Sequence, residues 1–199
     1  MRCLQPVRTV APAVTPVSLA EAKAHLNVDF ADDDALITAL IDAATEYFDG
    51  WSGTLGRALI TQTWQQAMSA FPASVRLWLP LAPVQSITSV QYYDAADVLQ
   101  TFAASNYRLQ ADGAGPYIEL VSGASWPNVG VRDDAVIVTF VAGYGNTGAD
   151  VPEPIRQAIL LLIGHLYENR EAVTVGVSAA DLPLGVSHLV APFARARIY

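Results

Sequence analysis

The residue types that most often carry chemistry are few in this sequence and stand apart from one another. The three histidines, His25, His165 and His188, lack the paired spacing of metal sites, such as two histidines four residues apart. Cys3 lies in a proline-rich stretch, which is a poor place for a positioned nucleophile. No glycine-rich nucleotide loop or nucleophile elbow occurs. The side chains therefore predict no enzyme and no bound cofactor or metal.

An aspartate triplet, Asp32-Asp33-Asp34, is the acidic run that could suggest a calcium site. It lacks the spaced oxygen ligands and the closing glutamate of an EF-hand loop. Acidic residues are favoured near a helix N-terminus, where they complement the helix dipole. The triplet therefore predicts the start of a helix.

The negative charge of the chain is concentrated in one region. The net charge is −8, and eight acids lie between Glu21 and Asp49 against Lys23 alone. The opposite sign appears near the other terminus, at Arg195 and Arg197. With one lysine and no basic stripe, a general nucleic-acid-binding surface is not expected. This polarity would suit copies that stack head to tail, although solvated faces are the commoner explanation of such charge runs.

Length and composition predict one substantial domain or two small ones. The chain has 199 residues, of which 52% are hydrophobic, enough for a real core. A single cysteine excludes an internal disulfide and suits a reducing compartment. Residues 1–16 have no apolar block and are interrupted by prolines, so no signal peptide is expected. No transmembrane segment is expected either, because the apolar run Ala158–Gly164 is far short of the roughly 20 residues that cross a bilayer.

The stretch Pro152–Glu171 predicts the central helix of the fold. Two prolines stand where the first turn tolerates a missing N–H. Apolar residues then recur at three- and four-residue steps, and Leu160 and Leu161 fill much of the opposite face, so we expect a buried helix. Its charged end, including Glu168 and Arg170, either faces a partner or subunit or is an ordinary solvated terminus.

Residues typical of helix N-termini predict two helices in the first part of the chain. Ser18 and Glu21 have the spacing of a capping box, so a short helix should run to Leu26. The second helix should begin at the aspartate triplet. Its apolar face is formed by Leu36, Ile37, Leu40, Ile41, Ala44, Tyr47, Phe48 and Trp51.

Alternating apolar and polar residues predict strands between these helical parts. We expect one mainly antiparallel sheet of about six strands and an α+β fold, in which terminal helical segments form a small bundle around an inserted β domain. The expected parts are an extended arm at 1–17, a helical part at 18–56, the β insert at 57–148, the central helix at 149–171 and a docking tail at 172–199.

The tail ends in apolar residues and arginines that have no obvious core partner in the sequence. Such residue types are common at binding hot spots, so a partner could order the segment. The alternative is that it lies along its own subunit. The candidate partner-binding residues are Leu189, Val190, Phe193, Arg195, Arg197, Ile198 and Tyr199.

The order of several short motifs resembles the head–tail connector (adaptor) proteins of tailed bacteriophages and gene transfer agents. The resemblance covers roughly residues 16–199. Where the family often has Tyr-Arg after the tail proline, this chain has Phe193-Ala194. The matching motifs are Ser18–Leu26, Asp32–Leu36, Ile60–Trp64, Leu79–Val84, Trp126-Pro127, Ala142–Tyr144, Val151–Ile155, Tyr167–Glu171, Leu182–Val186 and Leu189–Phe193.

The resemblance implies a non-enzymatic ring protein made in the bacterial cytoplasm and placed at the head–tail junction of a particle. About twelve copies would sit under the portal, contact tail-side connector or stopper proteins, and leave a channel through which DNA passes without sequence-specific binding. No membrane contact is implied. We expect a subunit interface at Asp32, Asp33, Asp34, Glu168 and Arg170, and portal binding by the tail.

Two other functions stay open at this point. The four tryptophans and the aspartates in turns could belong to a carbohydrate-binding module or an enzyme accessory domain built on the β insert. The chain could also be an intracellular assembly protein without a viral role. The oligomeric state in the presence of a partner distinguishes them.

Overall fold

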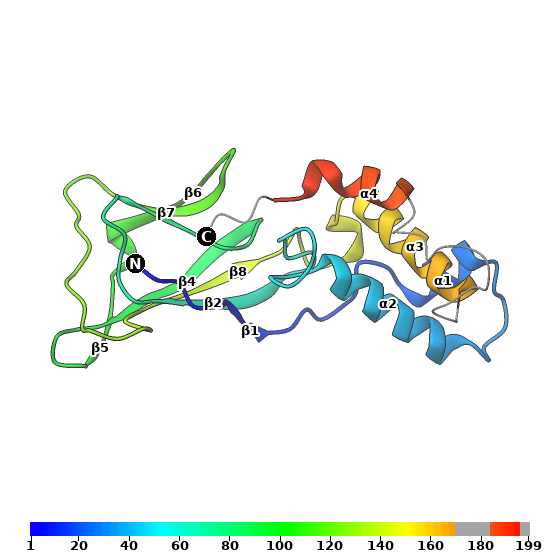
Figure 1. Ribbon diagram of the computed structural model, residues 1–199, viewed down its shortest axis with the longest axis horizontal. Coiled ribbons are helices and arrows are strands. Elements are labelled where there is room, and N and C mark those ends of the chain that lie inside the picture. The colour runs from blue at the N-terminus through cyan, green and yellow to red at the C-terminus, as the bar shows by residue number, and fades with distance from the viewer. Residues whose placement is uncertain (170–183, 196–199) are drawn as a thin grey trace, which may run out of the picture. The chain divides into compact units, whose positions relative to one another are not determined.

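The computed structural model describes residues 1–169 and 184–195, which form two compact units. We call residues 13–60, 145–169 and 184–195 the helical unit, and residues 1–12 and 61–144 the β unit. The chain is an α+β protein in which the sheet-forming segment interrupts the helical one (Figure 1). None of the described helices is both long and apolar enough to span a membrane.

The helical unit begins with a confirmed capping box. The Ser18 hydroxyl accepts a hydrogen bond from the Glu21 N–H, and the Glu21 carboxylate accepts one from the Ser18 N–H at 2.8 Å. Pro152 is the N-cap of α3, and Pro154 lies in its first turn, as the sequence predicts. The elements are α1 (Leu19–Leu26), α2 (Asp34–Phe48), η2 (Gly148–Asp150), α3 (Glu153–Glu168), α4 (Leu184–Val190) and η3 (Ala191–Phe193).

The pairing of α2 with α3 forms the core of the helical unit, and α1 and α4 also contact α3. Most side chains from the predicted apolar face of each helix are buried, but Leu36 and Leu40 are only half-buried. The expectation is wrong for Tyr47, which is 37% exposed, and for Trp51, which lies beyond the end of α2 and is half-buried. Leu161 is 38% exposed, so the expectation that α3 is buried almost all round is wrong on that side. The buried residues of the pair are Ile37, Ile41, Ala44, Phe48, Ile155, Ala158, Ile159, Leu160, Leu162 and Ile163.

The β unit contains two antiparallel sheets, so the expectation of a single sheet is wrong. The larger has the order β1-β2-β8-β4-β5 and the smaller the order β3-β7-β6. The alternation of apolar and polar residues along a segment predicts a strand but not its neighbours in a sheet. The sequence pattern therefore could not indicate that the strands form two sheets. The strands are β1 (Val7–Val10), β2 (Gln62–Met68), β3 (Arg76–Trp78), β4 (Val84–Tyr93), β5 (Leu99–Thr101), β6 (Tyr107–Asp112), β7 (Gly115–Leu120) and β8 (Val136–Ala142).

The amino-terminal arm contributes an edge strand to the larger sheet. Strand β1 pairs with β2, and two buried glutamines of β2 help to hold the arm. Gln66 Nε2 donates to the Leu4 carbonyl at 2.6 Å, and Gln62 Oε1 accepts from Arg8 Nη1 at 3.5 Å. The arm therefore packs by adding to a sheet that the rest of the β unit supplies.

An aromatic cluster packs the loop after β7 onto the β unit. Trp126 stacks on Phe71 with ring centroids 4.7 Å apart, and it also contacts Phe102. Its indole N–H donates to the Ser74 carbonyl at 2.9 Å. Trp64 is buried in β2. These tryptophans have packing roles, which gives the carbohydrate-binding alternative no support.

Candidate assembly surfaces

The search for a catalytic or metal centre ends at isolated groups. Within residues 1–169 and 184–195, no three histidine, cysteine, aspartate or glutamate side chains lie together in a way that could hold a metal ion. Cys3 lies opposite Met68 on the sheet, where partial desolvation raises the pKa of its thiol. A raised pKa lowers the reactive thiolate fraction at neutral pH. The candidate functional groups are therefore charged side chains on the surface of each unit.

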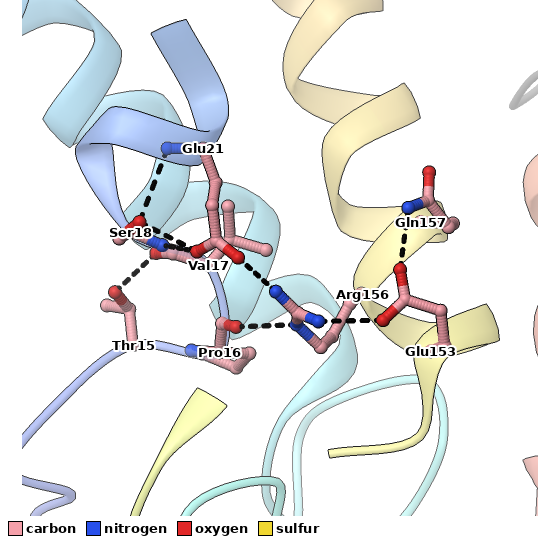
Figure 2. Close-up of polar contacts among 8 residues, drawn as sticks. All are labelled: Thr15, Pro16, Val17, Ser18, Glu21, Glu153, Arg156 and Gln157. Carbon is pink, nitrogen blue, oxygen red and sulfur yellow. Dashed lines mark hydrogen bonds and ion pairs between the residues drawn. The ribbon is translucent and has the colours of Figure 1, made fainter. Parts of the chain in front are cut away.

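A charged hub at Arg156 joins three segments of the helical unit (Figure 2). The Arg156 side chain is 17% exposed and forms ion pairs with Glu21 of α1 and with Glu153 of its own helix. Its Nε also donates to the Pro16 carbonyl at 3.3 Å. Arg156 thus fixes the segment before α1 against the first turn of α3. Of these Arg156 contacts, the sequence could indicate only the ion pair with Glu153, because residues three apart on a helix are neighbours.

Glu21 takes part in both the capping box and the Arg156 hub. Hydrogen bonds from the Ser18 hydroxyl and the Ser18 N–H lower the pKa of the Glu21 carboxyl, and the Arg156 charge lowers it further. Each contact favours the carboxylate over the neutral acid. The capping hydrogen bonds therefore keep Glu21 in the ionised form that pairs with Arg156, and so support the contact between α1 and α3.

Two members of the aspartate triplet are engaged inside the helical unit. Asp33 accepts a hydrogen bond from the Tyr167 hydroxyl at 2.5 Å, which places the start of α2 beside the end of α3. Asp34 pairs with Lys23 Nζ at 2.5 Å. Asp32 is exposed, as is Glu168. The structure thus brings Asp33 close to the α3 end that carries Glu168; the fifth predicted interface residue, Arg170, lies outside the described residues.

The described part of the tail lies along its own helical unit. Val186 of α4 is 1% exposed, and Arg57 Nε donates to the Phe193 carbonyl at 2.5 Å. The Arg195 N–H donates to the Leu55 carbonyl at 3.2 Å. Local sequence patterns could not predict these two hydrogen bonds, because each joins residues more than a hundred positions apart.

Four of the candidate docking residues, Leu189, Val190, Phe193 and Arg195, lie within the described part of the chain. Leu189, Val190 and Phe193 are half-buried. Burial and the nearby Arg57 charge lower the pKa of the Arg195 guanidinium, though it stays cationic at neutral pH. The remaining candidates, Arg197, Ile198 and Tyr199, lie outside the described residues.

Comparison with known proteins gives one family match and several structural matches. Residues 16–79 match the family described as phage gp6-like head-tail connector protein. No curated protein sequence matches the chain.

The structural matches span nearly the whole chain. A chain in the structure "Neck of empty GTA particle computed with C6 symmetry" is 29% identical, with 98% of both chains covered and a TM-score of 0.77. The structure "Virion of native gene transfer agent (GTA) particle" gives the same identity, coverage and TM-score. A chain in "Neck of native GTA particle computed with C12 symmetry" is 29% identical over 98% of both chains, with a TM-score of 0.72.

Proposed function

We propose that this chain, which is a head–tail connector protein of the phage type, forms a ring of about twelve copies between capsid and tail. Its role is structural: it joins the head to the tail of a phage-like particle. The observation that carries this function is the similarity to chains of gene transfer agent particles over 98% of both chains. The C6 and C12 symmetries of those neck structures support a ring.

We place this ring under the portal, with tail-side connector or stopper proteins on its other side. A closed ring requires a heterologous interface, in which two different patches of each copy meet. We assign Asp32, Asp33, Asp34, Glu168 and Arg170 to this interface or its border. The contacts of Asp33 and Asp34 within the helical unit leave Asp32 as the carboxylate of the triplet best suited to interact with a neighbour.

Packaged DNA passes through the axial channel without sequence-specific binding. An acidic wall repels phosphate and lets DNA slide, whereas a basic wall would retain it. The net charge of −8 supports such a wall. No membrane takes part, and the protein is made in the bacterial cytoplasm before it joins the particle.

The tail contacts the portal. Apolar side chains and arginines are the types that dominate binding hot spots, and arginine pairs in a bidentate manner with carboxylates. The candidates are Leu189, Val190, Phe193, Arg195, Arg197, Ile198 and Tyr199. Because residues 184–195 are already anchored to α3, Arg57 and Leu55, they present a preformed surface at low entropic cost.

A truncation series tests portal docking. Removing residues 196–199 leaves the contacts of Phe193 and Arg195 in place, so the melting temperature should stay within a few degrees of wild type while portal binding is lost. Removing residues 188–199 also deletes those contacts and should lower the melting temperature. Binding is measured by pull-down on the portal from the same particle. Full portal binding by both truncated proteins would contradict docking through the tail.

The ring itself is tested by native mass spectrometry of the full chain, alone and with the portal. A complex with many copies of this chain on one portal ring is expected. A monomer that never associates with the portal would contradict the proposed function.

A further inference from the structure

The smaller sheet has one buried face and one exposed face. Leu77 of β3 and Ile118 of β7 are buried and lie opposite each other in the register. Directly paired residues of antiparallel strands point to the same side, so the neighbours of this pair point outward. The register therefore places two rows of side chains on the other face: Arg76, Glu119 and Arg108 in one, and Trp78, Gln110 and the 7% exposed Tyr117 in the other.

On this face Arg76 packs over Tyr117, and Tyr117 contacts Trp78. The Arg76 guanidinium carbon lies 4.7 Å from the Tyr117 ring centroid, and the guanidinium pairs with Glu119 at 3.0 Å and Asp112 at 3.7 Å. Trp78 lies 4.9 Å from Tyr117 between ring centroids, yet remains 43% exposed. An exposed tryptophan that is already ordered loses little side-chain entropy on binding.

Arg108 supplies an available positive charge on the same face. It is exposed, on edge strand β6. No hydrogen bond or ion pair joins its guanidinium to another residue of the described part of the chain. By contrast, Arg76 in the same row is already bound to two carboxylates. The face thus combines an ordered tryptophan with an uncommitted arginine, the two residue types most enriched at hot spots.

The helical unit carries a surface of opposite charge on α2. Asp42 and Glu46 are four residues apart, so they share one side of the helix, and both are exposed. Within the described residues neither has an ion-pair partner, unlike Asp34, which pairs with Lys23. Tyr47, 37% exposed, lies on an adjacent side of α2, because residues one position apart on a helix do not share a face.

We propose that the Trp78–Arg108 face of one copy docks on the Asp42–Glu46 surface of the next copy. This contact rests on the proposed ring and specifies its interface. Heterologous closure needs two different, complementary patches on every copy. Here the two patches carry uncommitted charges of opposite sign, and the patch on the sheet adds the exposed Trp78 ring. Charge complementarity of this kind steers the encounter and fixes the register of the interface, and like charges placed opposite each other are strongly unfavourable.

A charge exchange within one chain tests the contact. Arg108→Glu and Glu46→Arg should each lower ring formation on the portal by about tenfold or more, since either creates like charges across the interface. The double variant restores the pair in exchanged orientation and should recover most of the assembly. Trp78→Ala should also weaken assembly. The matched control is Asp29→Arg, a charge reversal at an exposed acid outside both patches.

Assembly is followed by native mass spectrometry with the portal present, and circular dichroism checks that each variant is folded. Rings formed equally well by wild type, Arg108→Glu and Glu46→Arg would overturn the contact while leaving the proposed ring intact. A double variant no better than the single ones would also overturn it. Failure of the wild type to form any ring would instead remove the proposed function.

Discussion

At the scale of single residues, Arg156 has the strongest structural role in the helical unit. Its guanidinium reaches Glu21, Glu153 and the Pro16 carbonyl, and it is largely shielded from water. Hydrogen bonds to charged groups contribute more than neutral ones, and leaving their partners unsatisfied adds a desolvation cost.

Replacing Arg156 should therefore destabilise the protein. We expect Arg156→Met to lower the free energy of unfolding by about 2–3 kcal/mol. Arg108→Met is the matched control and should change it by less than about 0.5 kcal/mol, because Arg108 is exposed and makes no polar contact among the described residues. Urea unfolding of both variants measures this. Equal stability of the two would show that the Arg156 hub contributes nothing.

Glu21 makes the stability of the helical unit depend on pH. The pKa of its carboxyl is lower in the folded protein than in the unfolded chain, chiefly through the Ser18 side chain. A lowered folded pKa gives stability that is present above the unfolded value, about 4.3, and is lost as the pH falls through the folded value.

Ser18→Ala should accordingly raise the pKa of Glu21 toward its ordinary value. Titration of the Glu21 side-chain carbon by NMR measures the shift directly. Glu21→Gln should make the acid limb of the stability curve shallower than in wild type. An unchanged pKa in Ser18→Ala would mean that the Ser18 N–H and Arg156, and not the Ser18 hydroxyl, set it.

At the scale of elements, the antiparallel packing of α2 on α3 determines the stability of the helical unit. Leu162 is buried in this contact, whereas Leu40 is half-buried and Leu161 faces outward. We expect Leu162→Ala to cost about 2–5 kcal/mol, as large-to-small core changes do. Leu40→Ala should cost less, and Leu161→Ala less than about 1 kcal/mol.

Chemical denaturation of the three leucine variants gives this ranking. If Leu162→Ala were as stable as Leu161→Ala, the buried side of α3 would be assigned wrongly. The comparison is well matched because the two positions are adjacent on one helix and the side chain removed is the same.

The sequence predicted those elements whose signals are local. The Ser18–Glu21 cap, the prolines at the start of α3 and the period of α2 each lie within a few residues, and all are present in the structure. The separation into two sheets and the pairing of β1 with β2 join residues far apart, so local alternation could not indicate them.

For the candidate assembly residues, too, the sequence indicated local features but not long-range contacts. The sequence identified the aspartate triplet as a charged helix start, but not that Asp33 contacts Tyr167 or that Asp34 contacts Lys23. Likewise, apolar spacing in the tail gave no indication that Arg57 and Leu55 anchor it. Such contacts depend on tertiary structure, which brings together groups with no common sequence pattern.

At the scale of the whole molecule, assembly should respond to salt through exposed carboxylates. Asp32→Asn should change the salt dependence of ring formation while leaving unfolding within about 0.5 kcal/mol of wild type, because Asp32 is exposed. Asp34→Asn should also lower stability by about 1 kcal/mol, since it loses the Lys23 pair. Ring formation indifferent to salt and to both substitutions would exclude the triplet from the interface.

The central claim, a connector ring at the head–tail junction, is tested most directly by imaging the particle that contains this chain. Cryo-electron microscopy of the neck should show copies of the two-unit fold arranged around an axial channel, between the portal and the first tail-side protein. The map would also show whether residues 188–199 contact the portal and whether Arg108 lies against α2 of the next copy. Density for this chain elsewhere in the particle, or its absence from assembled particles, would contradict the account.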